Sequence, residues 1–132
     1  MILISKNTAN QNNIISDNVH VDHDKIKVGM CGTKYVGSDE YPIVVVDVIS
    51  NKRIVICHLL SHHMDKLVYD INKVQILPAE YLSEYLKINN NYYAPVTYSY
   101  RKNKRWMPAG SGQWDTCSIV IGRANEYRDS SF

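Results

Sequence analysis

The sequence predicts an α+β fold that is mainly an antiparallel β-sheet, barrel-like or a meander, with one covering helix. Apolar, β-branched runs of strand length recur along the chain and are separated by short polar turns. A single segment, residues 78–88, has the apolar spacing of a helix. The 132 residues suit one domain, and the hydrophobic fraction of 45% is that of an ordinary globular protein.

Residues 1–24 are predicted to form a flexible arm ahead of a single β-rich domain, residues 25–132. The arm is polar and rich in asparagine, and its start is too short in apolar residues for a signal peptide or a membrane span. The three cysteines lie far apart without a CxxC pair, which indicates reduced thiols in a reducing compartment. We therefore expect a cytoplasmic protein with no membrane partner.

The first half of the domain predicts three strands, at residues 26–31, 43–49 and 54–59. The last two are expected to form a hairpin around Ser50-Asn51-Lys52, and Gly32 is expected to lie in a turn. The strand at 43–49 is apolar on both faces except at one aspartate. We therefore expect this strand to be central and covered on both sides.

The predicted cover is the helix at residues 78–88. Pro78 suits its first turn, and an apolar stripe runs along one side, formed by Tyr81, Leu82, Tyr85 and Leu86. Three further strands are expected after this helix, at residues 96–100, 105–107 and 117–121. The total of five or six strands is typical of globular sheets.

Basic and aromatic residues alternate in the last third of the chain. A guanidinium binds phosphate through paired hydrogen bonds and an aromatic ring stacks on a base, so this mixture suits a nucleotide-type ligand. The net charge of +2 is too small for a general nucleic-acid binder, so the anion site is expected to be local. The candidate ligand-binding residues are Tyr98, Tyr100, Arg101, Asn103, Arg105, Trp106, Arg123 and Arg128.

A purely structural interpretation stays open for both parts of this candidate site. Residues 98–106 can be an exposed hairpin whose cations simply face solvent. The C-terminal segment can be a tail that docks through Phe132, with Arg128 paired to Glu126 or Asp129.

Motifs for catalysis are weak. Residues 110–112, Gly-Ser-Gly, lack both the strand-to-helix junction and the following Lys-Ser or Lys-Thr of a phosphate loop. Metal-ligand residues cluster at 57–65, but Cys57 and His58 are adjacent on a predicted strand and point to opposite faces. We interpret the cluster as a solvated loop rather than a metal site, and we predict neither enzymatic activity nor a cofactor.

Several segments together resemble a set of small bacteriophage proteins. They are Val28-Gly29-Met30, Gly37 to Pro42 ahead of a valine-rich strand, Tyr100 to Trp106, Ile121 to Arg123, and Glu126 to Phe132. This pattern is similar to the phage-encoded anti-Thoeris sponge proteins, which sequester cyclic ADP-ribose isomers and, in some members, cyclic oligonucleotides made by bacterial immune systems. The resemblance covers most residues from Val28 onward.

The resemblance implies a non-catalytic homo-oligomer with ligand pockets between subunits. Late arginines would hold the diphosphate and an aromatic side chain the adenine; Arg123, Arg128 and the aromatic residues around Tyr98 match such positions. The function that it implies is capture of a cyclic adenine nucleotide, which blocks the defence of the host.

Two alternatives belong to other classes. Residues 28–57 also resemble the small SH3-like barrels of translation and transcription factors, which implies a module that binds nucleic acid or protein. The third interpretation is a zinc hydrolase that uses His58, His62 and His63.

Overall fold

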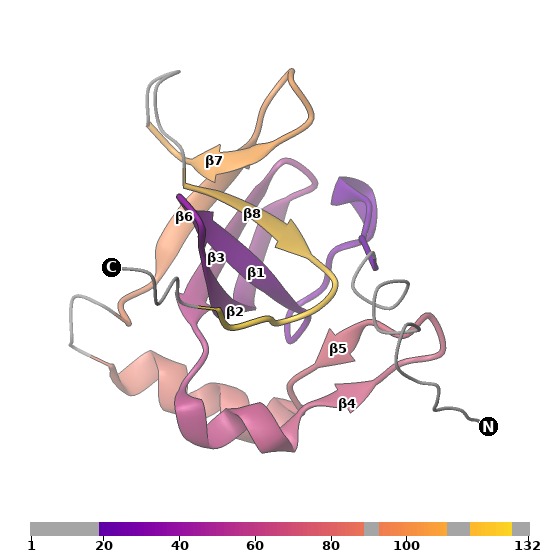
Figure 1. Ribbon diagram of the computed structural model, residues 1–132, viewed down its shortest axis with the longest axis vertical. Helices are drawn as coiled ribbons and strands as arrows, with labels where there is room; N and C mark the ends of the chain where they lie inside the picture. The colour runs from indigo at the N-terminus through magenta and orange to yellow at the C-terminus, as the bar shows by residue number, and fades with distance from the viewer. Residues whose placement is uncertain (1–18, 89–92, 111–116, 128–132) are drawn as a thin grey trace.

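The structure is a computed structural model that describes residues 19–88, 93–110 and 117–127. Its centre is a closed antiparallel barrel (Figure 1), which confirms the predicted fold class. The barrel strands are β1 (Cys31–Val36), β2 (Asp39–Ser50), β3 (Arg53–His58), β6 (Val96–Tyr100), β7 (Trp106–Pro108) and β8 (Ser118–Ile121). They follow this order around the barrel, and β8 closes it by pairing with β1.

Strand β2 organises the barrel because it is the longest strand and pairs along both edges. Val44 lies opposite Cys31 of β1 and opposite Cys57 of β3. Two register shifts interrupt its pairing with β3, between Val45 and Asp47 and again before Ser50. Such irregularities bend a strand and increase its twist, which lets a small sheet close on itself.

The predicted strand at residues 26–31 is wrong, because the first barrel strand begins only at Cys31. Gly29 has φ +96°, a left-handed conformation that ends any extended run before it. Gly32, predicted to lie in a turn, is inside β1. A side chain there would place its Cβ 2.4 Å from the carbonyl oxygen of Val120 on the neighbouring strand, so close strand approach requires glycine.

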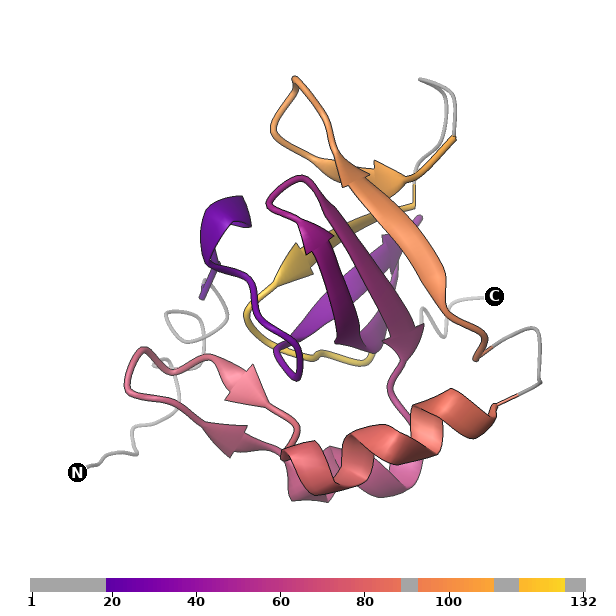
Figure 2. The same ribbon diagram turned by 180° about the vertical axis from the view of Figure 1, so that it is seen from behind.

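The chain between β3 and β6 leaves the barrel and lies across its lower end (Figure 2). It comprises the 3-10 helix η2 (Ser61–Lys66), a hairpin of β4 (Val68–Tyr69) and β5 (Gln75–Ile76), and the 3-10 helix η3 (Ala79–Lys87). The sequence predicted η3 but neither η2 nor the hairpin. A third 3-10 helix, η1 (His23–Lys25), lies near the opposite end of the barrel (Figures 1 and 2).

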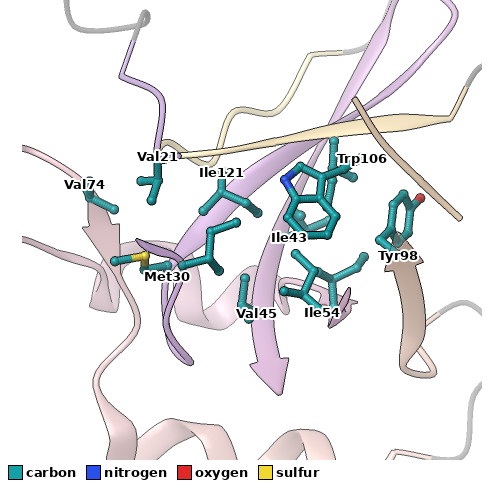
Figure 3. Close-up of a cluster of buried hydrophobic side chains, with 12 residues drawn as sticks. Val21, Met30, Ile43, Val45, Ile54, Val74, Tyr98, Trp106 and Ile121 are labelled. Atoms are coloured by element: carbon teal, nitrogen blue, oxygen red, sulfur yellow. The ribbon is translucent and has the colours of Figure 1, made fainter. Parts of the chain in front are cut away.

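Two apolar clusters stabilise this arrangement. The first fills the barrel and includes Ile43, Val45 and Ile54 (Figure 3). The second lies outside the barrel wall, where Val44 packs in one cluster with Tyr85 of η3. Alternate residues of β2 therefore enter different clusters, and the prediction of a strand covered on both sides is confirmed for residues 43–45.

The covering helix η3 follows a period of 3.0 residues per turn, not 3.6. Leu82, Tyr85 and Ile88 consequently align on the face that packs against the barrel. Leu86, predicted as part of the apolar stripe, is 85% exposed because the tighter helix rotates it away. The prediction for this residue is wrong.

The last six residues of the predicted arm, 19–24, pack against the barrel. Val21 is buried in the barrel cluster, and its N–H donates to the carbonyl oxygen of Ile121 at 2.8 Å. Residues 1–18 of the predicted arm lie outside the described residues. Within the described part of the chain, no helix has the length and hydropathy needed to cross a bilayer.

Candidate functional site

The β6–β7 turn is a compact five-residue reversal that presents cations. The N–H of Lys104 donates to the carbonyl oxygen of Arg101, and the N–H of Arg101 donates to that of Arg105, both at 2.9 Å. The side-chain oxygen of Asn103 accepts from the N–H of Arg105 at 3.1 Å. Asn103 thus stabilises the turn. Lys102, in the same turn, is exposed.

The β2–β3 turn lies beside this reversal (Figures 1 and 2). The N–H of Tyr100 donates to the carbonyl oxygen of Lys52 at 2.9 Å, and Arg53 pairs with Ser99 across β3 and β6. Cations from two distant parts of the sequence therefore meet at one end of the barrel. We call this surface the basic end; it comprises Lys52, Arg53, Arg101, Lys102, Lys104 and Arg105.

The basic end concentrates positive charge that the net charge of the chain conceals. It holds six of the 15 lysines and arginines, and the segments 48–53 and 98–108 that form it contain no acidic residue. Among the residues that the structure describes, Lys52, Lys104 and Arg105 form no ion pair within 4.0 Å. Exposed cations grouped in this way create a local positive potential that attracts anions.

An aromatic pair borders the basic end. The His23 ring of η1 stacks on Tyr100 with centroids 4.3 Å apart and planes 19° apart, and its Nδ1 lies 3.0 Å from the carbonyl oxygen of Asn51. Tyr100 also contacts the Trp106 ring, at 5.1 Å between centroids. His23 and Tyr100 are both half-buried, and the imidazole covers one face of the tyrosine ring. The sequence pattern did not indicate a ligand-binding role for His23.

Tyr98 and Trp106, two predicted ligand-binding residues, lie inside the barrel (Figure 3). Their exposed fractions are 1% and 4%, so a base cannot stack on either ring while the barrel is closed. They anchor the strands on both sides of the basic turn. The guanidinium of Arg101 already takes part in a contact within the protein, because it donates to the carbonyl oxygen of Pro108 at 2.9 Å.

Arg123 lies against the β4–β5 hairpin. Figure 1 shows this hairpin well away from the β6–β7 turn. The Nε of Arg123 donates to the carbonyl oxygen of Lys73 at 3.0 Å, and its guanidinium lies 4.9 Å from the centroid of the Tyr69 ring. Arg123 therefore forms a cation–π contact with a tyrosine of the hairpin, not with the aromatic residues around Tyr98. Arg128, the other late arginine of the prediction, lies outside the described residues.

A cleft of about 560 Å³ lies between the 19–30 segment and the β4–β5 turn. Its volume suits a small molecule. Its lining includes three carboxylates, Asp22, Asp24 and Asp70, against Lys25 and Lys27. A phosphate-bearing ligand would meet more negative than positive charge there, so the cleft does not replace the basic end as an anion site.

The histidine-rich segment is ordered around a side-chain cluster. Cys57 packs beneath η3 while His58 faces Tyr41, with 5.8 Å between ring centroids, which confirms that these neighbours point apart. His63 of η2 is 1% exposed and contacts Glu84 of η3. The prediction of a solvated loop is therefore wrong for His63, and no pattern in the sequence indicated Glu84 as its partner.

The chain has no match among protein-family models, curated proteins or solved structures. The functional interpretation of each candidate site therefore rests on the geometry of its own residues.

Proposed function

We propose that this protein is a non-catalytic binding module that holds a phosphate-bearing nucleotide ligand at the basic end. The observation that supports this function is the meeting of cations from two separate turns with no acidic residue in either. Lysine and arginine side chains bind phosphate by charge-assisted hydrogen bonds, and His23 offers a ring beside them for a base.

The open shape of the basic end favours an extended ligand. Turns form this surface, and none of its cations lines the cleft between the 19–30 segment and the β4–β5 turn. A single strand of nucleic acid can lie across such a surface and contact several cations through successive phosphates. The net charge of the chain made nucleic acid an unlikely partner, but the grouping of cations at one end of the barrel supplies locally the charge that the whole chain lacks. We therefore favour single-stranded nucleic acid as the ligand, as in the nucleic-acid version of the SH3-like alternative.

Sequestration of a cyclic adenine nucleotide is the second candidate, and the sequence resemblance favours it. A small ligand at an open surface leaves one side in water, so tight capture would need a second copy of the chain to close the site. The same cations would then hold the diphosphate. This version removes an immune signal without chemical change, and it requires a homo-oligomer.

The test compares two triple variants of equal charge. Lys52→Ala/Lys104→Ala/Arg105→Ala removes cations of the basic end, and Lys27→Ala/Lys66→Ala/Lys87→Ala removes three exposed lysines elsewhere. Each protein is titrated with a fluorescent single-stranded oligonucleotide at several salt concentrations. A cyclic dinucleotide and cyclic ADP-ribose are tested in parallel, followed by heat denaturation and recovery of the ligand.

The basic-end variant is expected to bind the oligonucleotide at least about tenfold more weakly than wild type, and its salt dependence is expected to flatten by about 0.7 per lost phosphate contact. The control variant is expected to retain most of the affinity. Retention of intact cyclic nucleotide by a dimer, with no oligonucleotide binding, would select the second candidate. Equal binding by both variants would contradict the basic end as the site in either version.

A further inference from the structure

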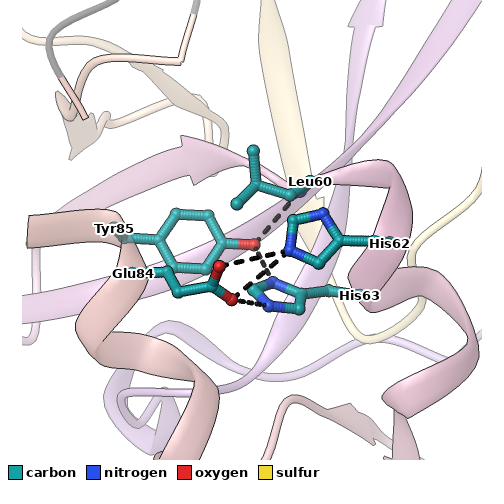
Figure 4. Close-up of polar contacts among 5 residues, drawn as sticks. All are labelled: Leu60, His62, His63, Glu84 and Tyr85. Atoms are coloured by element: carbon teal, nitrogen blue, oxygen red, sulfur yellow. Dashed lines mark hydrogen bonds and ion pairs between the residues drawn. The ribbon is translucent and has the colours of Figure 1, made fainter. Parts of the chain in front are cut away.

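Two imidazoles and one carboxylate meet where η2 packs against η3 (Figure 4). The Nε2 of His62 lies 3.2 Å from one carboxylate oxygen of Glu84 and 3.4 Å from the other, and the Nε2 of His63 contacts the second oxygen. One ligand atom from each residue lies within 4.8 Å of the other two. Bonds of about 2.0–2.1 Å in a tetrahedral zinc site place ligand atoms about 3.3 Å apart. The separation between His62 and Glu84 matches this spacing, and the shorter contact between His63 and Glu84 would lengthen as an ion enters.

A second hydrogen bond orients the buried imidazole. The Nδ1 of His63 lies 2.9 Å from the hydroxyl oxygen of Tyr85, which also accepts from the N–H of Leu60 at 3.1 Å (Figure 4). Tyr85 is itself 1% exposed and packs in the second apolar cluster, outside the barrel wall. Metal-binding histidines characteristically use the second ring nitrogen in this way, which fixes the ring and the lone pair of the first. A metal ion at Nε2 requires the tautomer with its proton on Nδ1, so the ion would take the place of the proton that joins His63 to Glu84 in the metal-free contact.

The charge and chemistry of the three groups select the class of metal. Two neutral imidazoles with one carboxylate suit a borderline ion such as Zn²⁺, whereas Ca²⁺ and Mg²⁺ require a set of oxygen ligands. The side chains of His62 and Glu84 are 63% and 46% exposed, so an ion and a fourth ligand from water can reach the cluster.

We propose that His62, His63 and Glu84 form a binding site for Zn²⁺ or a similar transition-metal ion, with water as the fourth ligand. The ion would join η2 to η3 and stabilise the segment that covers the barrel. This site differs from the zinc-hydrolase alternative, because Glu84 takes the place expected for His58. The inference concerns metal binding alone and is independent of the basic end.

The test uses the full chain after treatment with EDTA. Co²⁺ is added first, because tetrahedral coordination by these ligands gives visible absorption bands, and the affinity for Zn²⁺ is then measured by calorimetry. We expect one ion per chain and a higher melting temperature in the presence of Zn²⁺. His62→Ala and Glu84→Gln are each expected to weaken Zn²⁺ binding at least about tenfold, with folding checked by circular dichroism.

Matched controls remove the same chemical groups elsewhere. His20→Ala removes an exposed histidine outside the cluster, and Glu80→Gln removes a carboxylate from the exposed side of η3. Both are expected to bind Zn²⁺ like wild type. Absence of the Co²⁺ bands, or the same affinity in His62→Ala and Glu84→Gln as in wild type, would overturn the proposal and leave the cluster as a hydrogen-bonded contact between two helices.

Discussion

The basic end and the histidine cluster both consist of charged or ionisable side chains. They differ in whether those side chains contact a group of opposite charge. At the basic end, Lys52, Lys104 and Arg105 are exposed, and none forms an ion pair within the described part of the chain. In the cluster, both histidines contact the carboxylate of Glu84. Grouped like charges repel one another and favour an external anion, whereas opposed groups stabilise the packing of the elements that carry them.

The two regions also differ in what positions their side chains. Backbone hydrogen bonds and buried rings inside the barrel fix the turns of the basic end, so its cations are not needed for folding. Direct side-chain contacts hold the histidine cluster together, so changes there should affect stability. Substitutions in each region test this distinction.

The largest expected change in stability separates two neighbouring residues at the basic end, one buried and one exposed. Trp106→Ala removes a core ring and should lower the free energy of unfolding by about 3–5 kcal/mol. Arg105→Ala removes an exposed cation and should change it by less than about 0.5 kcal/mol. Urea unfolding measures both. A comparable loss in Arg105→Ala would mean that the cations of this turn are structural.

A smaller loss of stability is expected when the Tyr85 hydroxyl group, which contacts the histidine cluster, is removed. Tyr85→Phe leaves the N–H of Leu60 and the Nδ1 of His63 without this partner, which should lower stability by about 1–3 kcal/mol. Tyr81→Phe is the matched control, because Tyr81 packs in the same cluster through its ring. Equal unfolding midpoints for the two variants would show that the Tyr85 hydroxyl does not hold the cluster.

The pH dependence of stability should report on Glu84 in the metal-free protein. Its histidine partners lower its pKa from the usual value of 4.5, so its contribution is fully present above that pH. The contribution is lost as the pH falls through the lower pKa of the folded state. Glu84→Gln should therefore reduce the melting temperature near neutral pH and converge with wild type in acid. Parallel melting curves at all pH values would exclude a stabilising contact.

The smallest effect concerns the thiols beneath η3. Burial raises the pKa of Cys31 to about 12 and that of Cys57 to about 11, so both should resist an aromatic disulfide reagent in the native state. Tyr85→Phe should increase the rate at which Cys57 reacts, because it weakens the cover. Cys117 is half-buried and serves as an internal reference. If Cys57 already reacts as fast as Cys117 in wild type, η3 does not protect the barrel wall.

Local patterns in the sequence predicted most of the barrel. Residues 43–49 and 54–59 are nearly continuous apolar, β-branched runs of strand length, and the structure contains strands there. The prediction at 26–31 was wrong because the apolar run does not reveal the left-handed conformation of Gly29. The β4–β5 hairpin was missed because its strands are two residues long and leave no periodic signal.

The candidate sites were visible in the sequence only where their residues are neighbours along the chain. The alternation around Arg105 indicated a basic turn, but Lys52 and His23 join it only through closure of the barrel. Glu84 lies 21 residues from His63 and joins the cluster through packing of η3 on η2. The sequence pattern also could not distinguish an aromatic ring in the core, such as Tyr98, from one that faces a ligand.

The decisive measurement for the basic end is how the affinity for a single-stranded oligonucleotide depends on salt concentration. The measurement compares wild type with Lys52→Ala/Lys104→Ala/Arg105→Ala. The slope of the logarithm of affinity against the logarithm of salt concentration should be smaller in the variant by about 2, which is about 0.7 for each of the lost phosphate contacts. Unfolding free energies of the two proteins should agree to within about 0.5 kcal/mol per substituted residue. Identical slopes in two folded proteins would contradict the assignment of the basic end as the ligand site.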